Sequence, residues 1–242
     1  MKTIGYLGPE GTYTQIALEK HSEAFSEAIE KKPVRSIQKL FDDLQSGVVE
    51  EIVVPVENSI EGSVSVTMDK FVKTNDIFIQ KEIILSISHS LLSKDNVALQ
   101  DVTDVISHSQ PLGQCQQFIH EKLPEAKSHV TSSTAEAAKI IQSDRSFFAD
   151  GKPHVCVAIG NKRLADMYNL QVIKENINDY EGNQTRFYVL GKTQADPSGH
   201  DKTAIVFSAS KDKPGSLCKN LLYFEEEKIN LTHIRSEEHT SE

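Results

Sequence analysis

Apolar and polar positions follow two different periods along the chain. Short apolar runs predict strands, and segments with an apolar residue every three or four positions predict helices. The predicted strands cover 3–8, 51–59, 77–93 (as one or two strands), 102–108, 128–132, 154–160 and 183–191. The predicted helices cover 12–25, 36–47, 64–74, 111–123, 133–143 and 161–170.

Strands separated by helices of this size favour parallel sheets with helices on both faces, and there are enough units for two such sheets. The segment 191–203 breaks the pattern with Gly, Pro, Ser and Asp, so residues 192–201 are predicted to form a linker. After Lys202 the pattern predicts a strand, a loop, a helix and the start of another strand. That fragment is too short to bury both of its faces unaided.

Composition narrows the class of protein. A chain of 242 residues with 38% hydrophobic content can build more than one domain. Its net charge of −9 argues against nucleic acid or an anionic membrane as the main partner. The three cysteines lie far apart, and the N-terminus lacks the apolar run of a signal peptide, so we expect a reduced, cytoplasmic protein without a disulfide framework.

Several chemistries have no support in the sequence. There is no G-x-G-x-x-G fingerprint, the nine histidines never take metal-ligand spacing, and the cysteines never form C-x-x-C. A nucleophile elbow of the G-x-S-x-G type is also absent. We therefore expect no cofactor and no metal.

Polar residues gather instead where predicted strands end. The four clusters are "GPEGTYT" (8–14), "VPVENSIEGS" (54–63), "SHSQPLGQC" (107–115) and "GNQTRF" (182–187). Each alone has an ordinary structural reading: Thr12 as a helix cap, Asn58 in an Asx turn, His108 as a hydrogen-bonded structural residue. Because ligands collect at the strand ends of open α/β sheets, the four together predict a cleft lined by hydroxyls and amides. Arg186 would clamp a carboxylate there.

The motifs also carry a resemblance. "GYLGPEGTYT", "VPVENSIEGSV", "SHSQPLGQC", "STAEAA" and "NQTRF" resemble, in this order and spacing, the prephenate dehydratase family over residues 3–191. Residues 202–234, with "PGSL" and "INLTHI", resemble the front of a regulatory ACT domain. The resemblance implies two α/β subdomains around a cleft, similar to a periplasmic binding protein, followed by a partial ferredoxin-like ACT domain. The lobes are then expected at about 1–76 plus 176–191, and at 77–175.

The resemblance implies a carbon–oxygen lyase that converts prephenate to phenylpyruvate in phenylalanine biosynthesis. Thr185 would assist departure of the 4-hydroxyl, and Arg186 would anchor a carboxylate. Other positions match the family's polar surroundings of the substrate: Asn58, Ser107 and Gln114, with Glu57 as a neighbour. Four more are expected to bind substrate, namely Gly11, Thr12, Ser59 and Gln110.

Two alternatives stay open at this point. Arogenate dehydratase shares the motifs, and a non-enzymatic two-lobed binding protein could use the same cleft. A binder needs the arginine but has no use for Thr185, so the pair favours an enzyme. The family usually forms homodimers or tetramers, partly through the ACT domain.

The chain departs from the family at two places. Ser109 stands where the family commonly has Pro, which removes a constraint on that loop. After "INLTHI" the family continues with Glu-Ser-Arg-Pro, whereas this chain reads "RSEEHTSE", which resembles a translated sequencing adapter. Residues 235–242 are therefore expected to be a non-native tail after a truncated ACT domain. Pro214, Gly215 and Leu217 match the family's phenylalanine-binding loop.

Overall fold

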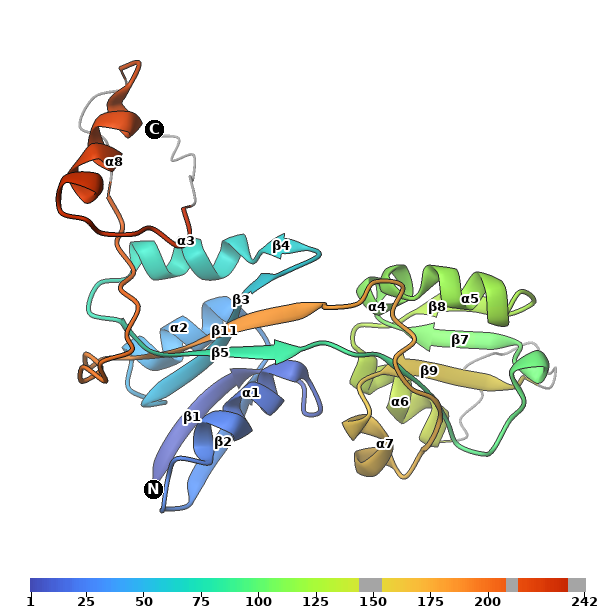
Figure 1. The fold of residues 1–242 in the computed structure, drawn as a ribbon. Helices are drawn as coiled ribbons and strands as arrows, with labels where there is room; N and C mark the ends of the chain where they lie inside the picture. The colour runs from blue at the N-terminus through green and yellow to red at the C-terminus, as the bar shows by residue number, and fades with distance from the viewer. Residues whose placement is uncertain (144–153, 208–212, 235–242) are drawn as a thin grey trace. The chain divides into compact units, whose positions relative to one another are not determined.

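The computed structural model describes residues 1–143, 154–207 and 213–234 (Figure 1). The chain divides into two compact units, Met1–Asp196 and Pro197–Glu242. This division falls inside the linker predicted at 192–201. The suspected tail at 235–242 lies outside the described residues.

The strands of the first unit are β1 (Lys2–Leu7), β2 (Ile29–Val34), β3 (Glu51–Asn58), β4 (Gly62–Ser63), β5 (Phe78–Ser86), β6 (Ser90–Ser93), β7 (Asp104–Ser107), β8 (Lys127–Val130), β9 (Cys156–Gly160), β10 (Gln171–Lys174) and β11 (Gln184–Gly191). Its α-helices are α1 (Tyr13–Ser22), α2 (Ile37–Gln45), α3 (Ser65–Lys73), α4 (Ser109–Gln114), α5 (Gln116–Lys122), α6 (Thr134–Gln142) and α7 (Arg163–Tyr168). Each predicted strand and helix up to residue 191 has a counterpart among them.

The strands form two separate sheets, each the centre of one lobe. The first has the order β2-β1-β3-β11-β5, with β4 paired to β3, and the second has the order β10-β6-β9-β7-β8. The prediction of parallel sheets holds for the pairs β1–β2, β1–β3, β7–β8 and β7–β9, but both sheets are mixed. β11 is antiparallel to β3 and β5, and β6 is antiparallel to β9 and β10, because these strands are not joined by simple helical crossovers.

Helices cover both faces of each sheet, as the alternation of strands and helices predicts. In the first lobe, alternate residues of β11 enter two cores. Phe187 and Val189 pack with the residues of α1, whereas Leu190 packs with those of α2. In the second lobe, Ile106 faces α6 and its neighbour Val105 faces the side of α5. The two-lobed α/β fold expected from the sequence is confirmed.

The predicted lobe boundary after residue 76 differs from the observed sheets. β5 pairs along its length with β11, so residues 78–86 belong to the first lobe. The chain crosses to the second lobe through residues 87–89 and returns through 175–183. The two crossovers are bonded to each other: Ile87 donates to the Asn183 carbonyl at 2.8 Å, and Ile177 donates to the His89 carbonyl at 3.0 Å.

Other differences lie in weakly patterned segments. β2 and β10 were not predicted, because β2 reads "IEKKPV" and has no apolar period. Its Pro33 is tolerated because β2 is an edge strand. The helix predicted at 111–123 begins earlier, at Ser109, since the His108 ring accepts from the Gln110 N–H and caps it. It is interrupted at Cys115, where ψ is 21°.

The second unit matches its prediction only in part. The expected helix is α8 (Ser216–Glu226), preceded by Gly215 at φ +83°. The strand expected from Lys202 is not formed over 202–207, and none of the described residues after Pro197 is in a strand. No described residue of this unit is buried, and Leu222 on α8 is 50% exposed. Among the residues described in the whole chain, no helix has the length and apolarity needed to cross a membrane.

Candidate functional site

Thr185 and Asn58 lie opposite each other on β11 and β3. The Asn58 Nδ2 atom donates to the Thr185 hydroxyl oxygen at 2.8 Å. Asn58 Oδ1 accepts from the backbone N–H groups of Ile60 and Glu61, both at 3.0 Å. Asn58 therefore forms the Asx turn that its sequence context predicts, and the same side chain also contacts Thr185.

These contacts fix the direction of the hydrogen bond to Thr185. Because Oδ1 of Asn58 is held by two N–H donors, its Nδ2 must face the threonine. The Thr185 oxygen is then an acceptor toward Asn58, and no described residue accepts the Thr185 proton. The hydroxyl is therefore left with a proton that it can donate to a ligand.

A chain of buried amides extends from this pair to the second lobe. Asn58 Nδ2 also donates to Asn183 Oδ1 at 2.8 Å, and Asn183 Nδ2 donates to Gln114 Oε1 at 3.1 Å. The His89 ring contacts the same Gln114 oxygen at 2.9 Å, and Gln114 Nε2 donates to Glu61 Oε1 at 3.0 Å. Asn58, Asn183, Gln114 and His89 are each less than one-tenth exposed. The structure thus joins three predicted site residues, Thr185, Asn58 and Gln114, through Asn183, and His89 is bonded to the Gln114 end.

Asn183 and His89 were not among the predicted site residues. Asn183 lies inside the quoted "GNQTRF" motif, and His89 interrupts the apolar run 77–93. Burial lowers the pKa of His89 below its usual value, and its hydrogen bond to Gln114 opposes that shift. The sequence carried one signal for His89, namely that a polar residue interrupts a predicted strand there.

Arg186 does not join this cluster. Side chains alternate along a strand, so Arg186 points to the sheet face opposite that of Thr185. Its Nη1 lies 3.7 Å from Glu57 Oε2, and its Nε lies 3.1 Å from Glu82 Oε1, without the alignment of a hydrogen bond. Glu57 likewise lies on this second face, opposite Arg186 in the β3–β11 pairing.

Three other predicted site residues lie outside the chain of buried amides. Ser107 is fully buried and donates to the Ile159 carbonyl at 2.7 Å, within the second sheet. The Ser59 hydroxyl accepts from the Gln184 N–H at 2.9 Å, next to Thr185. Gln110 is exposed in the first turn of α4. Ser59 is therefore close to the Thr185 cluster, whereas Ser107 is engaged elsewhere.

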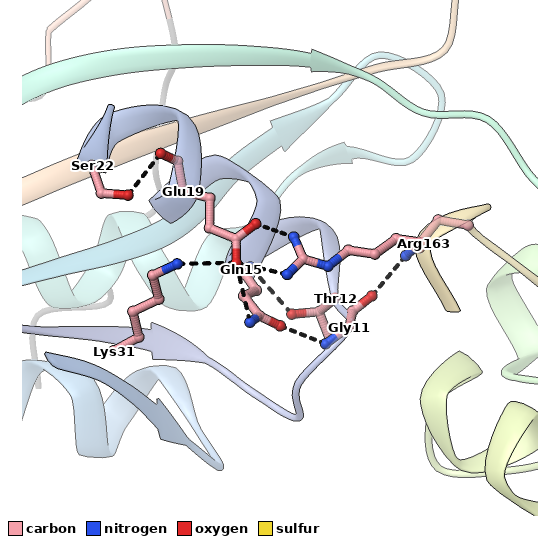
Figure 2. A network of polar contacts seen from close by, with 8 residues as sticks. Gly11, Thr12, Gln15, Glu19, Ser22, Lys31 and Arg163 are labelled. Carbon is pink, nitrogen blue, oxygen red and sulfur yellow. Dashed lines mark hydrogen bonds and ion pairs between the residues drawn. The ribbon is translucent and has the colours of Figure 1, made fainter. Parts of the chain in front are cut away.

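Gly11 and Thr12 directly precede α1, and Gly11 contacts the second lobe (Figure 2). Gly11 has φ +85°, and its carbonyl accepts from Asn161 Nδ2 at 2.7 Å. A Cβ atom at Gly11 would lie 2.5 Å from Leu164 Cδ2, so only glycine fits this approach. The Thr12 hydroxyl caps the helix, accepting from the Gln15 N–H at 3.4 Å.

A cluster of ion pairs also joins α1 of the first lobe to α7 of the second. Arg163 of α7 donates from both terminal nitrogens to the Glu19 carboxylate of α1, one of these contacts being 2.7 Å (Figure 2). Lys31 of β2 contacts Glu19 from the other side at 3.2 Å. The hydrogen bond from Arg163 is the main cause that lowers the pKa of Glu19. We call Glu19, Arg163 and Lys31 the interlobe ion cluster.

The molecule is thus a two-lobed α/β protein with a hydroxyl donor held by neutral amides where its lobes meet. No group of three His, Cys, Asp or Glu suited to a metal ion occurs within residues 1–143, 154–207 and 213–234. The family model described as "Prephenate dehydratase" matches residues 4–195. The chain belongs to the prephenate dehydratase family.

Individual relatives agree with this membership. The prephenate dehydratase of Methanocaldococcus jannaschii is 38% identical over 238 residues, covering 97% of this chain and 82% of the relative. The bifunctional chorismate mutase/prephenate dehydratase of Pseudomonas aeruginosa is 36% identical over 233 residues, covering 96% of this chain. This chain spans 60% of the length of that bifunctional relative.

A solved structure shares the fold. The crystal structure of prephenate dehydratase from Arthrobacter aurescens in complex with L-Phe has a TM-score of 0.83 and 29% identity. The match covers 97% of this chain and 76% of that one.

Proposed function

We propose that this chain catalyses the decarboxylating dehydration of prephenate to phenylpyruvate in L-phenylalanine biosynthesis. The observation that carries the proposal is the Thr185 hydroxyl, which accepts from Asn58 and keeps its own proton for a ligand. Family membership supplies the substrate class. The range of reactions that such a site can catalyse is narrow, because the cluster around Thr185 holds amides and a hydroxyl rather than a nucleophile–base pair.

The reaction suits a weak proton donor. The bond between the ring and its carboxylate breaks, CO₂ leaves, and the released electron pair enters the ring. The C4–O bond breaks in turn, and the departing hydroxyl takes the Thr185 proton, which solvent then replaces, and leaves as water. Because the ring becomes aromatic, a donor as weak as the Thr185 hydroxyl suffices, and positioning contributes much of the rate.

The substrate's carboxylates need donors other than Arg186, since that side chain faces Glu57 and Glu82 on the opposite face of the sheet. We propose that the N-terminus of α1, after Gly11 and Thr12, binds one of them. Free N–H groups and the helix dipole favour an anion there. Ser59 and Gln114 would contact the substrate from the Thr185 side.

The direct test is incubation of the 242-residue chain with prephenate, followed by absorbance of phenylpyruvate in alkali. We expect turnover that depends on enzyme concentration. Arogenate assayed in parallel separates the two dehydratases by their kcat/KM values. Saturable prephenate binding without any product would instead indicate a binding protein and contradict the proposal.

The interlobe ion cluster gives a prediction about substrate affinity. Arg163→Met removes the guanidinium but keeps most of the side-chain volume, so one tie between the lobes is lost. Arg163 and Glu19 are about one-third and one-quarter exposed, so the expected rise in KM is small, less than about five-fold, and kcat should change little. The difference from the wild type should shrink in 1 M salt, where charges are screened. A rise in KM that persists in high salt would contradict an electrostatic tie.

The second unit gives a prediction about regulation. The Arthrobacter aurescens relative was crystallised with L-Phe, and Pro214, Gly215 and Leu217 of this chain match the family's phenylalanine-binding loop. Leu217 is 48% exposed, and none of the described residues around α8 forms a strand that could complete such a site. We therefore expect the 242-residue chain to be insensitive to phenylalanine and to self-associate through α8.

Phenylalanine titrated into an active preparation checks the first expectation, and light scattering over a range of protein concentrations checks the second. Saturable inhibition at micromolar phenylalanine would show that the effector site does form. A monodisperse monomer at all concentrations would contradict self-association through α8.

A further inference from the structure

We propose that His89 and Asn183 are positioning residues that fix the Gln114 amide and, through Asn58, the Thr185 hydroxyl. The effect of this positioning on the reaction rate rests on the function proposed above. Neither residue contacts Thr185 directly; each acts through a neighbour.

Two backbone N–H groups fix the direction of the whole chain of hydrogen bonds. The N–H groups of Ile60 and Glu61 can only donate, so the atom of Asn58 that they contact must be its oxygen. Asn58 Nδ2 is then the donor toward Asn183, which must present its own oxygen at 2.8 Å. The other end of the Asn183 amide is therefore a donor.

The order of donors and acceptors continues into the second lobe. Asn183 Nδ2 donates to Gln114 at 3.1 Å, so Gln114 presents Oε1 to it. Gln114 Nε2 consequently faces the Glu61 carboxylate, which can only accept. Each amide in the chain thus has one orientation, which the backbone N–H groups at the Asn58 end and the Glu61 carboxylate at the Gln114 end both require.

This order determines the tautomer of His89. The ring nitrogen Nε2 lies 2.9 Å from Gln114 Oε1, an acceptor, so Nε2 carries the proton. Its Nδ1 is buried without a hydrogen-bond partner among the described residues. A proton added at Nδ1 would have no acceptor, which agrees with the lowered pKa that burial gives this ring.

The positions of these residues explain why they matter for orientation. His89 lies in the first crossover between the lobes, where its backbone N–H donates to Asn178 Oδ1 at 2.7 Å. Asn183 ends the second crossover, and its carbonyl accepts from Ile87. Gln114 belongs to the second lobe and Asn58 to the first. The chain of amides therefore connects the positions of the two crossover segments, 87–89 and 175–183, to the orientation of the Thr185 hydroxyl.

The kinetic test uses a matched pair of substitutions. His89→Leu removes the donor to Gln114, whereas His89→Gln can place an amide N–H near the position of Nε2. We expect His89→Leu to lower kcat about 10- to 100-fold, the cost of a small misplacement of catalytic groups, with KM little changed. His89→Gln should recover most of that loss, which a merely space-filling histidine would not explain. His120→Leu, on the exposed side of α5, is the control for a changed histidine.

A second measurement does not need activity. The ¹⁵N signals of the His89 ring in the full chain, assigned by comparison with His89→Gln, should show a neutral Nε2–H tautomer at pH 7. An Nδ1–H tautomer or a charged ring would overturn the proposed donor order. Unchanged kcat in a folded His89→Leu protein would overturn the positioning role. If the wild-type chain failed to convert prephenate, the proposed function would fail, and the ring tautomer alone would decide the donor order.

Discussion

Thr185→Ala should lower kcat by about 10²–10⁴-fold, the usual contribution of a positioned proton donor. The substitution removes the hydroxyl that Asn58 orients and leaves the β11 backbone unchanged. Asn58 Nδ2 keeps two acceptors, Asn183 Oδ1 and the Gln184 carbonyl, so no buried donor is left without a partner. KM should rise much less than kcat falls, because the hydroxyl acts mainly in the transition state.

Thr185→Ser is the matched control, since it keeps a hydroxyl at the same atom and loses one methyl group. We expect the serine variant to retain most of kcat. Steady-state kinetics on prephenate for both variants, with thermal unfolding as a check on folding, makes the comparison. Full activity in Thr185→Ala would exclude Thr185 as the proton donor.

Much of the fold could be predicted because its strongest elements combine a clear period with a clear end. Helix α2 is an example: Leu40, Phe41 and Leu44 share one buried face, and Ser36 caps the helix through the Lys39 N–H. β2 is the opposite case. Its pairing with β1 is what makes it a strand, and that long-range contact leaves no apolar pattern in "IEKKPV".

The sequence predicted several residues of the candidate site, but it did not predict how their side chains are arranged. Their adjacency in the sequence suggests that Thr185 and Arg186 act as a pair, but adjacent strand residues face opposite sides of a sheet. The pairing of Thr185 with Asn58 and of Arg186 with Glu57 separates them. The period of two along a strand is the physical reason why the two side chains lie apart.

The contacts of Asn183 and His89 could not be predicted from the sequence, for a different reason. Their importance depends on contacts with Gln114, which lies 69 residues from Asn183 and 25 from His89. A single sequence carries no signal for which polar residue of one crossover meets which amide of the other lobe. Only the fold brings them together, at the junction of the two crossovers.

Asn58→Asp tests whether the direction of the Asn58–Thr185 hydrogen bond matters, apart from its presence. One carboxylate oxygen can still accept from the Ile60 and Glu61 N–H groups, so the turn after β3 should persist. The other oxygen replaces the Nδ2 donor and can only accept, so the Asn183 amide has to turn and present its own Nδ2 to it. The Thr185 proton would then be drawn to Asp at position 58 and withheld from the ligand.

We therefore expect Asn58→Asp to lower kcat by about 10²–10⁴-fold, close to the loss in Thr185→Ala. The two changes should not be additive, because a reversed hydrogen bond has no effect on kcat once the hydroxyl is gone. Kinetics of Asn58→Asp, Thr185→Ala and the double variant measure this coupling, with Asn58→Ser as the control that keeps a short acceptor for the turn but adds no charge. If the losses in kcat simply multiplied, Asn58 would contribute independently of Thr185, and the oriented-donor arrangement would be wrong.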